Sequence, residues 1–326
     1  MVLANIALFV LSCAVLVLAG SFLVKGVVAI ANFLKIKHFV VAAAVMAVST
    51  SLPELFVGIS SAAAKNSALS LGNVIGANIA DLTLVAGVGL IIARKTKITS
   101  KMIKKDAWIM LLAAMLPLVL MFLGNELSKT DGIILLTAFA LYVAKLAINY
   151  KARDGGLENT PAKSSVILYS VFFIPMILLL FYSAKYVVHY GSALALELLL
   201  PPIFIGLFFV SLGTTLPEMV FGSSAMLAKH PELSMGNLIG SVIVNSTLVL
   251  GIAAIIFPIK TNFLLFFSSS VFLLIIAFLF ATLLTSGKIN WIEGIALILF
   301  YIFFLIIELS LKGIIPAMNI TGLFFA

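Results

Sequence analysis

Ten long apolar segments fill most of this sequence, and short polar connections separate them. Each segment approaches or exceeds about 20 residues, which is the length that an α-helix needs to cross a bilayer. None shows the short alternating pattern of a membrane strand. The sequence therefore predicts an all-α polytopic membrane protein. The ten expected helices cover residues 3–24, 38–64, 68–93, 107–124, 131–149, 165–188, 200–228, 232–257, 263–285 and 291–312.

The second and third segments are duplicated in the seventh and eighth. Residues 48–87 align without a gap with residues 212–251, at a constant offset of 164, and nineteen of the forty pairs are identical. The longest polar connection, residues 151–163, lies between the two copies. Because an odd number of crossings separates the copies, they enter the membrane in opposite senses, as in many secondary transporters.

We therefore expect two inverted five-helix repeats. The first covers residues 1–160 and carries its duplicated stretch at about 40–90. The second covers residues 161–326 and carries its copy at about 204–254.

Composition and charge agree with this class. The chain is 63% hydrophobic and only 10% charged, whereas about a quarter of a soluble domain is charged. Net charge +8 does not require a nucleic-acid partner, because fifteen of the twenty Lys and Arg residues fall in inside loops if the N-terminus is outside. The positive-inside rule then places both termini outside the cytoplasm, in a multi-pass protein of the cell membrane. Cys13 is the single cysteine, so no intrachain disulfide can form.

Each copy places a proline and a glutamate inside an apolar segment. The first copy contains Leu52-Pro53-Glu54, and the second contains Leu216-Pro217-Glu218. A charged group near the bilayer centre costs at least about 2.5 kcal/mol, so such acids usually face a cavity and serve a function. Proline removes a helix hydrogen bond and should free carbonyl oxygens about one turn upstream. Carboxylates, hydroxyls and freed carbonyls form an all-oxygen set, which suits calcium or sodium.

A second duplicated element follows. It runs from Gly72 to Asp81 in the first copy and from Gly236 to Asn245 in the second. Its paired glycines predict close helix packing. Asn73 and its counterpart Asn237 can either ligate an ion or bond one helix to another, and the sequence leaves both interpretations open.

The buried acids predict exchange by competition. Two carboxylates about 5 Å apart repel by roughly 3 kcal/mol at an effective dielectric constant near 20. We expect the empty site to bind protons and a divalent cation to displace them. Sodium and calcium then compete for one oxygen-lined site. The sequence shows no paired metal-ligating histidines and no nucleophile with a base, so we expect no enzyme and no cofactor.

At these residues the sequence resembles the sodium/calcium exchanger branch of the cation/calcium exchanger superfamily. The resemblance covers both duplicated elements and the ten-helix plan. It implies that Glu54 and Glu218 ligate calcium together with backbone oxygens near Thr50 and Thr214. It also implies long first and sixth helices that slide to alternate access. The remaining residues that we assign to the calcium and sodium sites are Ser51, Thr215, Ser241, Asp81, Asn245, Asn78, Ala47 and Ser211.

Four positions depart from the family pattern. Ser49 replaces a usual glycine, and Ala77 stands where a serine hydroxyl is common. The resemblance places asparagine in the first half and aspartate in the second, whereas here Asp81 and Asn245 are exchanged. Coupling to sodium is therefore less firmly indicated than calcium binding. The 151–163 connection is also too short for a calcium-sensing domain.

The leading hypothesis is a secondary antiporter that exchanges sodium for calcium by alternating access at a shared mid-membrane site. A proton/calcium antiporter, or a potassium-dependent one, on the same fold is the alternative. A channel is a third class, although nothing resembles a selectivity filter. The expected partners are the two ions and membrane lipids, with no nucleic acid and no obligate protein partner. The basic stretch Lys95–Lys105 either orients the chain or binds anionic lipid.

Overall fold

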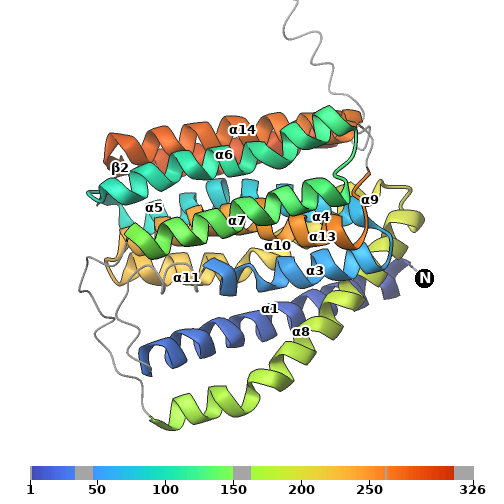
Figure 1. Ribbon diagram of the computed structural model, residues 1–326, viewed down its shortest axis with the longest axis horizontal. Helices are drawn as coiled ribbons and strands as arrows, with labels where there is room; N and C mark the ends of the chain where they lie inside the picture. Colours follow the sequence, from blue (N-terminus) through green and yellow to red (C-terminus); the bar gives the residue numbers. More distant parts are fainter. Residues whose placement is uncertain (1, 34–46, 150–162, 261–262, 312–326) are drawn as a thin grey trace, which may run out of the picture.

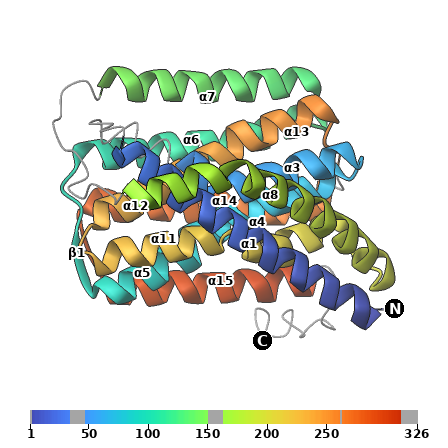
Figure 2. The ribbon, with the colours of Figure 1, turned by 90° about the horizontal axis from the view of Figure 1, so that it is seen from below.

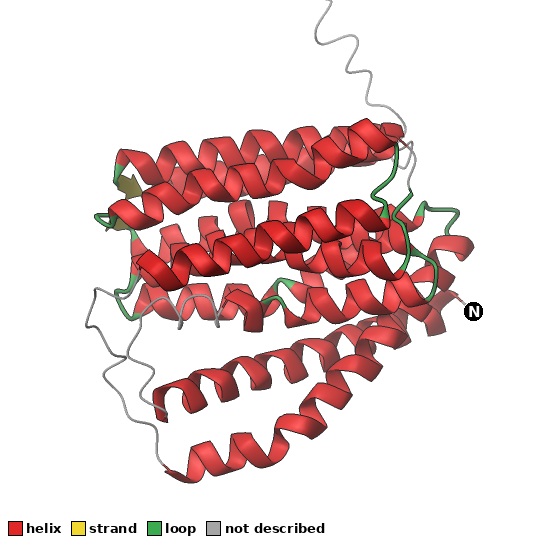
Figure 3. Cartoon of the chain, in the orientation of Figure 1, coloured by secondary structure: helices red, strands yellow, loops and turns green. Residues whose placement is uncertain are grey.

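The computed structural model describes residues 2–33, 47–149, 163–260 and 263–311. These residues are mostly helical, and most of the helices run side by side in one bundle (Figures 1 and 3). Among them, seven helices are long and apolar enough to cross a membrane. The number becomes eight if the pair Pro202–Thr214 and Leu216–Leu227, bent by 40°, forms one span. The described part of the chain is thus that of a helical multi-pass membrane protein.

From residues 47 and 211 onward, the two duplicated stretches fold into the same series of elements. The first contains helical residues 47–50, α3 (Leu52–Ala63), α4 (Ser67–Ala80), the π-helix η1 (Asp81–Val85) and α5 (Ala86–Ala93). The second contains α9 (Pro202–Phe204), the π-helix η2 (Ile205–Val210), α10 (Ser211–Thr214), α11 (Leu216–Leu227), α12 (Pro231–Val244), the π-helix η3 (Asn245–Val249) and α13 (Leu250–Ile256). From the start of α3 to the end of η1, every boundary recurs 164 residues later.

The helix breaks lie just before the two Pro-Glu pairs. The helical residues 47–50 end at Thr50, and α3 begins after Ser51. In the second copy, Thr215 separates α10 from α11. Each proline occupies the second position of the new helix, where its missing N–H costs no helix hydrogen bond. The predicted interruption is therefore present in both copies.

The π-helices η1 and η3 were not predicted. Each contains a threonine whose hydroxyl donates to the carbonyl four residues earlier, Thr83 to Ile79 and Thr247 to Ile243, both at 2.5 Å. Such a side chain competes with the backbone N–H for the same acceptor. π-turns are frequent at functional sites. Asp81 and Asn245 are the first residues of η1 and η3.

Glycines let α4 approach the second copy very closely. A Cβ atom added at Gly72 would overlap the carbonyl of Ile203, and one added at Gly76 would overlap that of Leu207. From the other side, a Cβ atom at Gly206 would overlap the carbonyl of Leu69. The predicted small-residue contact therefore joins α4 to α9 and η2, in backbone-to-backbone packing that larger residues would prevent.

Six further long helices surround this centre. They are α1 (Val2–Phe33), α6 (Lys101–Gly124), α7 (Lys129–Asn149), α8 (Lys163–Glu197), α14 (Phe263–Ser286) and α15 (Trp291–Leu311). The helices α1 and α8 are longer than the sequence predicted. They pack against each other (Figures 1 and 2) and, with Val57, Leu69, Ile205 and Val210, build an apolar cluster distinct from the main one.

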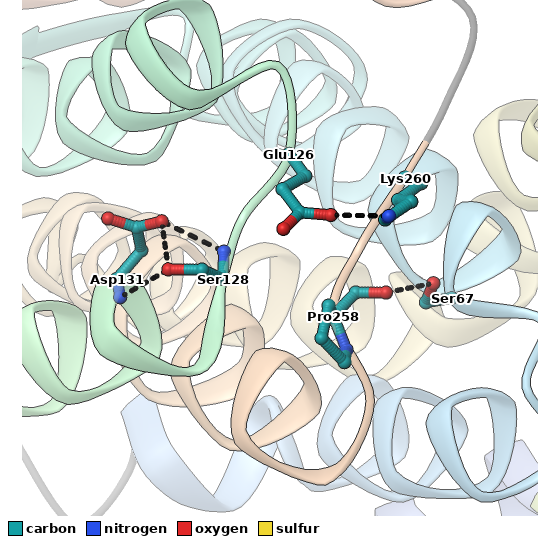
Figure 4. Close-up of polar contacts among 6 residues, drawn as sticks. All are labelled: Ser67, Glu126, Ser128, Asp131, Pro258 and Lys260. Carbon is teal, nitrogen blue, oxygen red and sulfur yellow. Dashed lines mark hydrogen bonds and ion pairs between the residues drawn. The ribbon is translucent and has the colours of Figure 1, made fainter.

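Short backbone pairings join the connections at each end of the bundle. At one end the strands β1 (Lys95–Lys97) and β2 (Lys288–Asn290) pair antiparallel, although no strand was expected. At the other end, Leu127 and Ile259 form an isolated bridge. Beside that bridge an ion pair of 2.9 Å joins Glu126 to Lys260 (Figure 4).

The same end carries two further contacts (Figure 4). Ser67 donates to the carbonyl of Pro258 over 3.1 Å, which fastens the start of α4 to the connection after α13. Ser128 and Asp131 bond reciprocally and cap α7. Two parts of the sequence prediction lie outside the described residues: positions 38–46 of the second segment and positions 151–162 of the polar connection.

Candidate functional site

All twelve residues assigned from the sequence are buried, with at most 2% of each side chain exposed. Large apolar side chains meanwhile face outward, among them Leu3, Ile167 and Val171, each more than 60% exposed. This polar interior inside an apolar shell is the arrangement expected of ionisable groups in a membrane protein.

Three acids meet at the helix breaks. Glu54 lies in the first turn of α3 and Glu218 in the first turn of α11, where the positive end of a helix dipole favours a carboxylate. Asp81 lies where α4 continues into η1. Glu218 is close enough to interact electrostatically with both other acids, and Glu54 interacts with Asp81. One oxygen of each carboxyl group has no hydrogen-bond partner among the described residues.

Two reciprocal hydrogen bonds join the copies at the breaks. Thr50 donates to Asn237 Oδ1 over 3.4 Å, and Thr214 donates to Asn73 Oδ1 over 3.2 Å. Both partners of the first bond lie 164 positions from their counterparts in the second. The threonine hydroxyls also face the acid of the opposite copy, Thr214 facing Glu54 and Thr50 facing Glu218.

Ser241 contacts three other predicted site residues. Its hydroxyl lies 3.1 Å from that of Ser51 and 3.4 Å from Glu218 Oε1, and it interacts with Asp81. The equivalent position in the first copy is Ala77, which has no hydroxyl. The hydroxyl that contacts Asp81 therefore comes from the second copy.

A chain of amide contacts links η3 to α4. Asn245 Nδ2 donates to Asn78 Oδ1 over 3.2 Å, and Asn78 Nδ2 donates to Ser246 over 2.9 Å. Sequence reasoning missed Ser246, because its counterpart in the first copy is Leu82 and the duplication gave no signal there. Its position beside Asn245 inside an apolar segment was the available indication.

Ala47, Ser211 and Thr215 bond mainly within their own helices. The Ala47 carbonyl accepts the backbone N–H of Ser51 over 3.2 Å. The Ser211 carbonyl accepts both the backbone N–H and the hydroxyl of Thr215, over 2.9 and 2.7 Å. These hydrogen bonds therefore shape the two breaks and stay within each copy.

Two acids outside the site are buried as well. Glu308 near the end of α15 is fully buried and accepts from Ser269 over 2.9 Å. Asp106 in α6 is 6% exposed and forms a 2.5 Å ion pair with Lys145. Burial alone therefore does not single out the three acids at the breaks.

The geometry favours a site built from mixed oxygen ligands. In the described part of the chain, no three His, Cys, Asp or Glu side chains form a group that could hold a metal by themselves. A cation between the acids would need hydroxyl, amide and carbonyl oxygens to complete its shell. Calcium takes six to eight such oxygens, and sodium is likewise a hard cation.

Comparison with known proteins gives a consistent picture. The sequence profile of the family described as sodium/calcium exchanger protein matches residues 4–147 and 168–309. The sodium/calcium exchanger MaX1 of Methanosarcina acetivorans is 29% identical, over 94% of this chain and 99% of its own length. The putative antiporter CaxA of Alkalimonas amylolytica is 27% identical, over 72% of this chain and 75% of its own.

Solved structures of the sodium-calcium exchanger NCX_Mj also match. One of them, soaked with sodium and strontium, superposes with a TM-score of 0.67 at 27% identity and covers 93% of this chain and 98% of its own. Others were soaked with sodium alone or with sodium and calcium, and they match with a TM-score of 0.66.

The crowding of the three acids predicts an effect on stability. In cation-free detergent solution, at a pH high enough to deprotonate the empty site, Asp81→Asn should raise the melting temperature, because it then removes one of three mutually repelling charges. Asparagine retains an oxygen for Ser241, and the second copy already carries Asn245 at this place. We expect a gain on the order of 1 kcal/mol. Asp106→Asn is the matched control and should lower the melting temperature by breaking the ion pair with Lys145. A lower melting temperature for Asp81→Asn would show that the three charges do not repel in the empty protein.

Proposed function

The chain belongs to the sodium/calcium exchanger protein family, and on that premise we propose that it exchanges sodium for calcium across the cell membrane. Its relatives are transporters rather than enzymes, and the cation/calcium antiporter class follows from family membership. The choice of sodium as counter-ion, the ion site and the alternating access are our proposals.

The observation that carries the proposal is the meeting of Glu54 and Glu218 at two equivalent helix breaks. Each acid faces a threonine of the other copy, so neither half contains a complete site. A calcium ion between the two acids would be held by both carboxylates and by backbone oxygens near Thr50 and Thr214. Asp81, Ser51 and Ser241 lie beside that position.

The remaining assigned residues would serve the flanking sodium positions. They are Asn245, Asn78, Thr215, Ser211 and Ala47, all of which are buried. Calcium and sodium would neutralise the same acids, so the binding of one would expel the other. Exchange then needs only competition at the site and its alternating exposure to the two sides.

We propose that the full architecture has ten membrane helices in two inverted repeats, residues 1–160 and 161–326, with both termini outside the cytoplasm. Element boundaries that recur at an offset of 164 support the duplication. The backbone pairings at the ends support the inversion. One pairing joins the connection after α5 to that after α14, and the other joins the connection after α13 to that after α6.

The helices α1 and α8 are the candidates for the moving part. They share an apolar cluster with a few residues of α3, α4 and η2, and this cluster is distinct from the larger one that contains α5, α12 and α13. They still reach the breaks, since a Cβ atom added at Gly20 of α1 would approach the ring of Pro53 to 2.9 Å. Sliding of this pair across the breaks would expose the site to one side and then to the other.

Sodium coupling is the first experiment. In everted membrane vesicles, calcium uptake should follow an imposed sodium gradient and should persist when the proton gradient is collapsed with an uncoupler. Vesicles from cells without the protein are the control. Uptake that responds to a proton gradient and ignores sodium would favour the proton/calcium antiporter, and a requirement for added potassium would favour the potassium-dependent one.

Substitution of the two acids tests the shared site. Glu54→Gln and Glu218→Gln should each reduce calcium exchange about 100-fold or more, because removing one partner from a buried charged assembly typically costs 3–5 kcal/mol. Glu308→Gln makes the same chemical change at a buried acid outside the site and should leave exchange close to normal. Gel filtration checks the fold of all three variants. Near-normal exchange by either site variant would refute the shared site.

A further inference from the structure

We propose that Asn73 and Asn237 are positioning residues, each of which holds the threonine of the opposite copy in the orientation that a bound cation needs. This inference rests on the proposed function of the same site and adds to it the group that fixes each helix break. The sequence left these asparagines undecided between ligating an ion and bonding one helix to another. Their contacts favour the second role.

The contacts are reciprocal across the duplication. Asn73 in α4 accepts from Thr214 at the end of α10, and Asn237 in α12 accepts from Thr50, the last helical residue before α3. All four side chains are at most 2% exposed. A pair of contacts that recurs with both partners shifted by 164 residues is a feature of the duplicated architecture rather than an accident of local packing.

Each threonine hydroxyl has one proton and several acceptors. For Thr214, the acceptors are Asn73 Oδ1 at 3.2 Å, the Ser211 carbonyl at 3.2 Å and the facing carboxyl of Glu54. For Thr50, they are Asn237 Oδ1 at 3.4 Å, the Ala47 carbonyl at 3.3 Å and Glu218.

Cation binding changes the balance among these acceptors. Once a cation occupies the two carboxylates, they are poorer acceptors for the threonine protons, and the amide oxygens remain. The asparagines would therefore keep both threonines in place when the site is loaded. Because each threonine lies at a helix break, the same contact also fixes the direction of the backbone oxygens there.

The amide groups are poorly arranged to ligate the cation themselves. Their oxygens already accept from threonine, and their Nδ2 atoms have no hydrogen-bond partner among the described residues. An amide nitrogen is a donor only and cannot coordinate a cation. In the empty site these N–H groups would be satisfied by water or by a reorienting carboxylate.

Double-mutant cycles test this assignment, because the structure predicts which pairs interact. Asn73→Leu and Thr214→Val should each weaken calcium binding about tenfold, which corresponds to about 1.4 kcal/mol. The double variant should also bind about tenfold more weakly, since both changes remove one contact. The crossed variant Asn73→Leu/Thr50→Val breaks two different contacts, so its calcium affinity should fall about 100-fold. The reciprocal cycle uses Asn237→Leu with Thr50→Val, and Thr214→Val as its crossed control.

Two measurements on each variant separate positioning from simple structural support. Isothermal titration in detergent gives the calcium dissociation constant, and a cation-free melt gives stability. A merely structural role would lower the melting temperature and leave the dissociation constant unchanged, and that result would overturn the proposal. Thr214→Ser keeps the hydroxyl and should bind calcium within about twofold of wild type. If Thr214→Ser weakened calcium binding as much as Thr214→Val does, that result would also overturn the proposal.

Failure of this inference can be distinguished from failure of the proposed function. If the wild-type protein binds calcium and exchanges it for sodium, but the paired and crossed double variants lose affinity equally, only the role of the asparagines is wrong. If the wild-type protein shows no calcium binding at all, the site itself is wrong.

Discussion

Burial of three acids at two breaks inside an apolar bundle is the constraint on which this structure depends. Glu54, Asp81 and Glu218 are at most 1% exposed and lie close enough to repel one another. Such a group is costly in a low-dielectric interior unless donors, helix N-termini or a cation offset the charge. The helix starts at α3 and α11 supply the dipoles, and Thr50, Thr214 and Ser241 supply hydroxyls. The glycines of α4 bring the two copies close enough to act on the same acids.

The duplication repeats the helices and their breaks in both copies, but the charged residues of the site are not distributed symmetrically. The helix breaks and the threonine–asparagine contacts recur at the same offset in both copies. The acid at Asp81 has no counterpart, because position 245 is asparagine, and the hydroxyl at Ser241 has none, because position 77 is alanine. These two departures belong together, since Ser241 of the second copy contacts Asp81 of the first. The counterpart contact, from position 77 to position 245, has neither the hydroxyl nor the acid.

Much of this arrangement could be predicted from the sequence, because membrane burial makes each polar residue informative. The length of the apolar segments indicated a helical membrane protein, and the Pro-Glu pairs indicated where helices break. The offset of 164 indicated that two equivalent elements form one site. All twelve assigned residues are buried around the breaks, although their roles as ion ligands remain a prediction.

Other features depend on three-dimensional contacts that the pattern of residues does not record. The π-helices η1 and η3 each contain a threonine that bonds to a carbonyl four residues earlier, and a threonine in an apolar segment does not by itself indicate such a turn. Ser246 lies opposite Leu82 in the alignment, so the duplication concealed it. Glu308 is close to a helix end in the sequence, yet packing against α14 buries it completely. The role of Asn73 could not be predicted either. Only the structure shows that its amide oxygen accepts from Thr214, which favours a positioning role over ligation of the ion.

The central claim is that one cation is held jointly by the two copies of the break. The most direct measurement is a crystal structure of the protein soaked with calcium or strontium, with the ion located by its anomalous scattering. The account predicts a peak between Glu54 and Glu218, within about 2.3–2.6 Å of a carboxylate oxygen of each when calcium is bound. An ion coordinated by only one of these glutamates, or located away from both breaks, would contradict it.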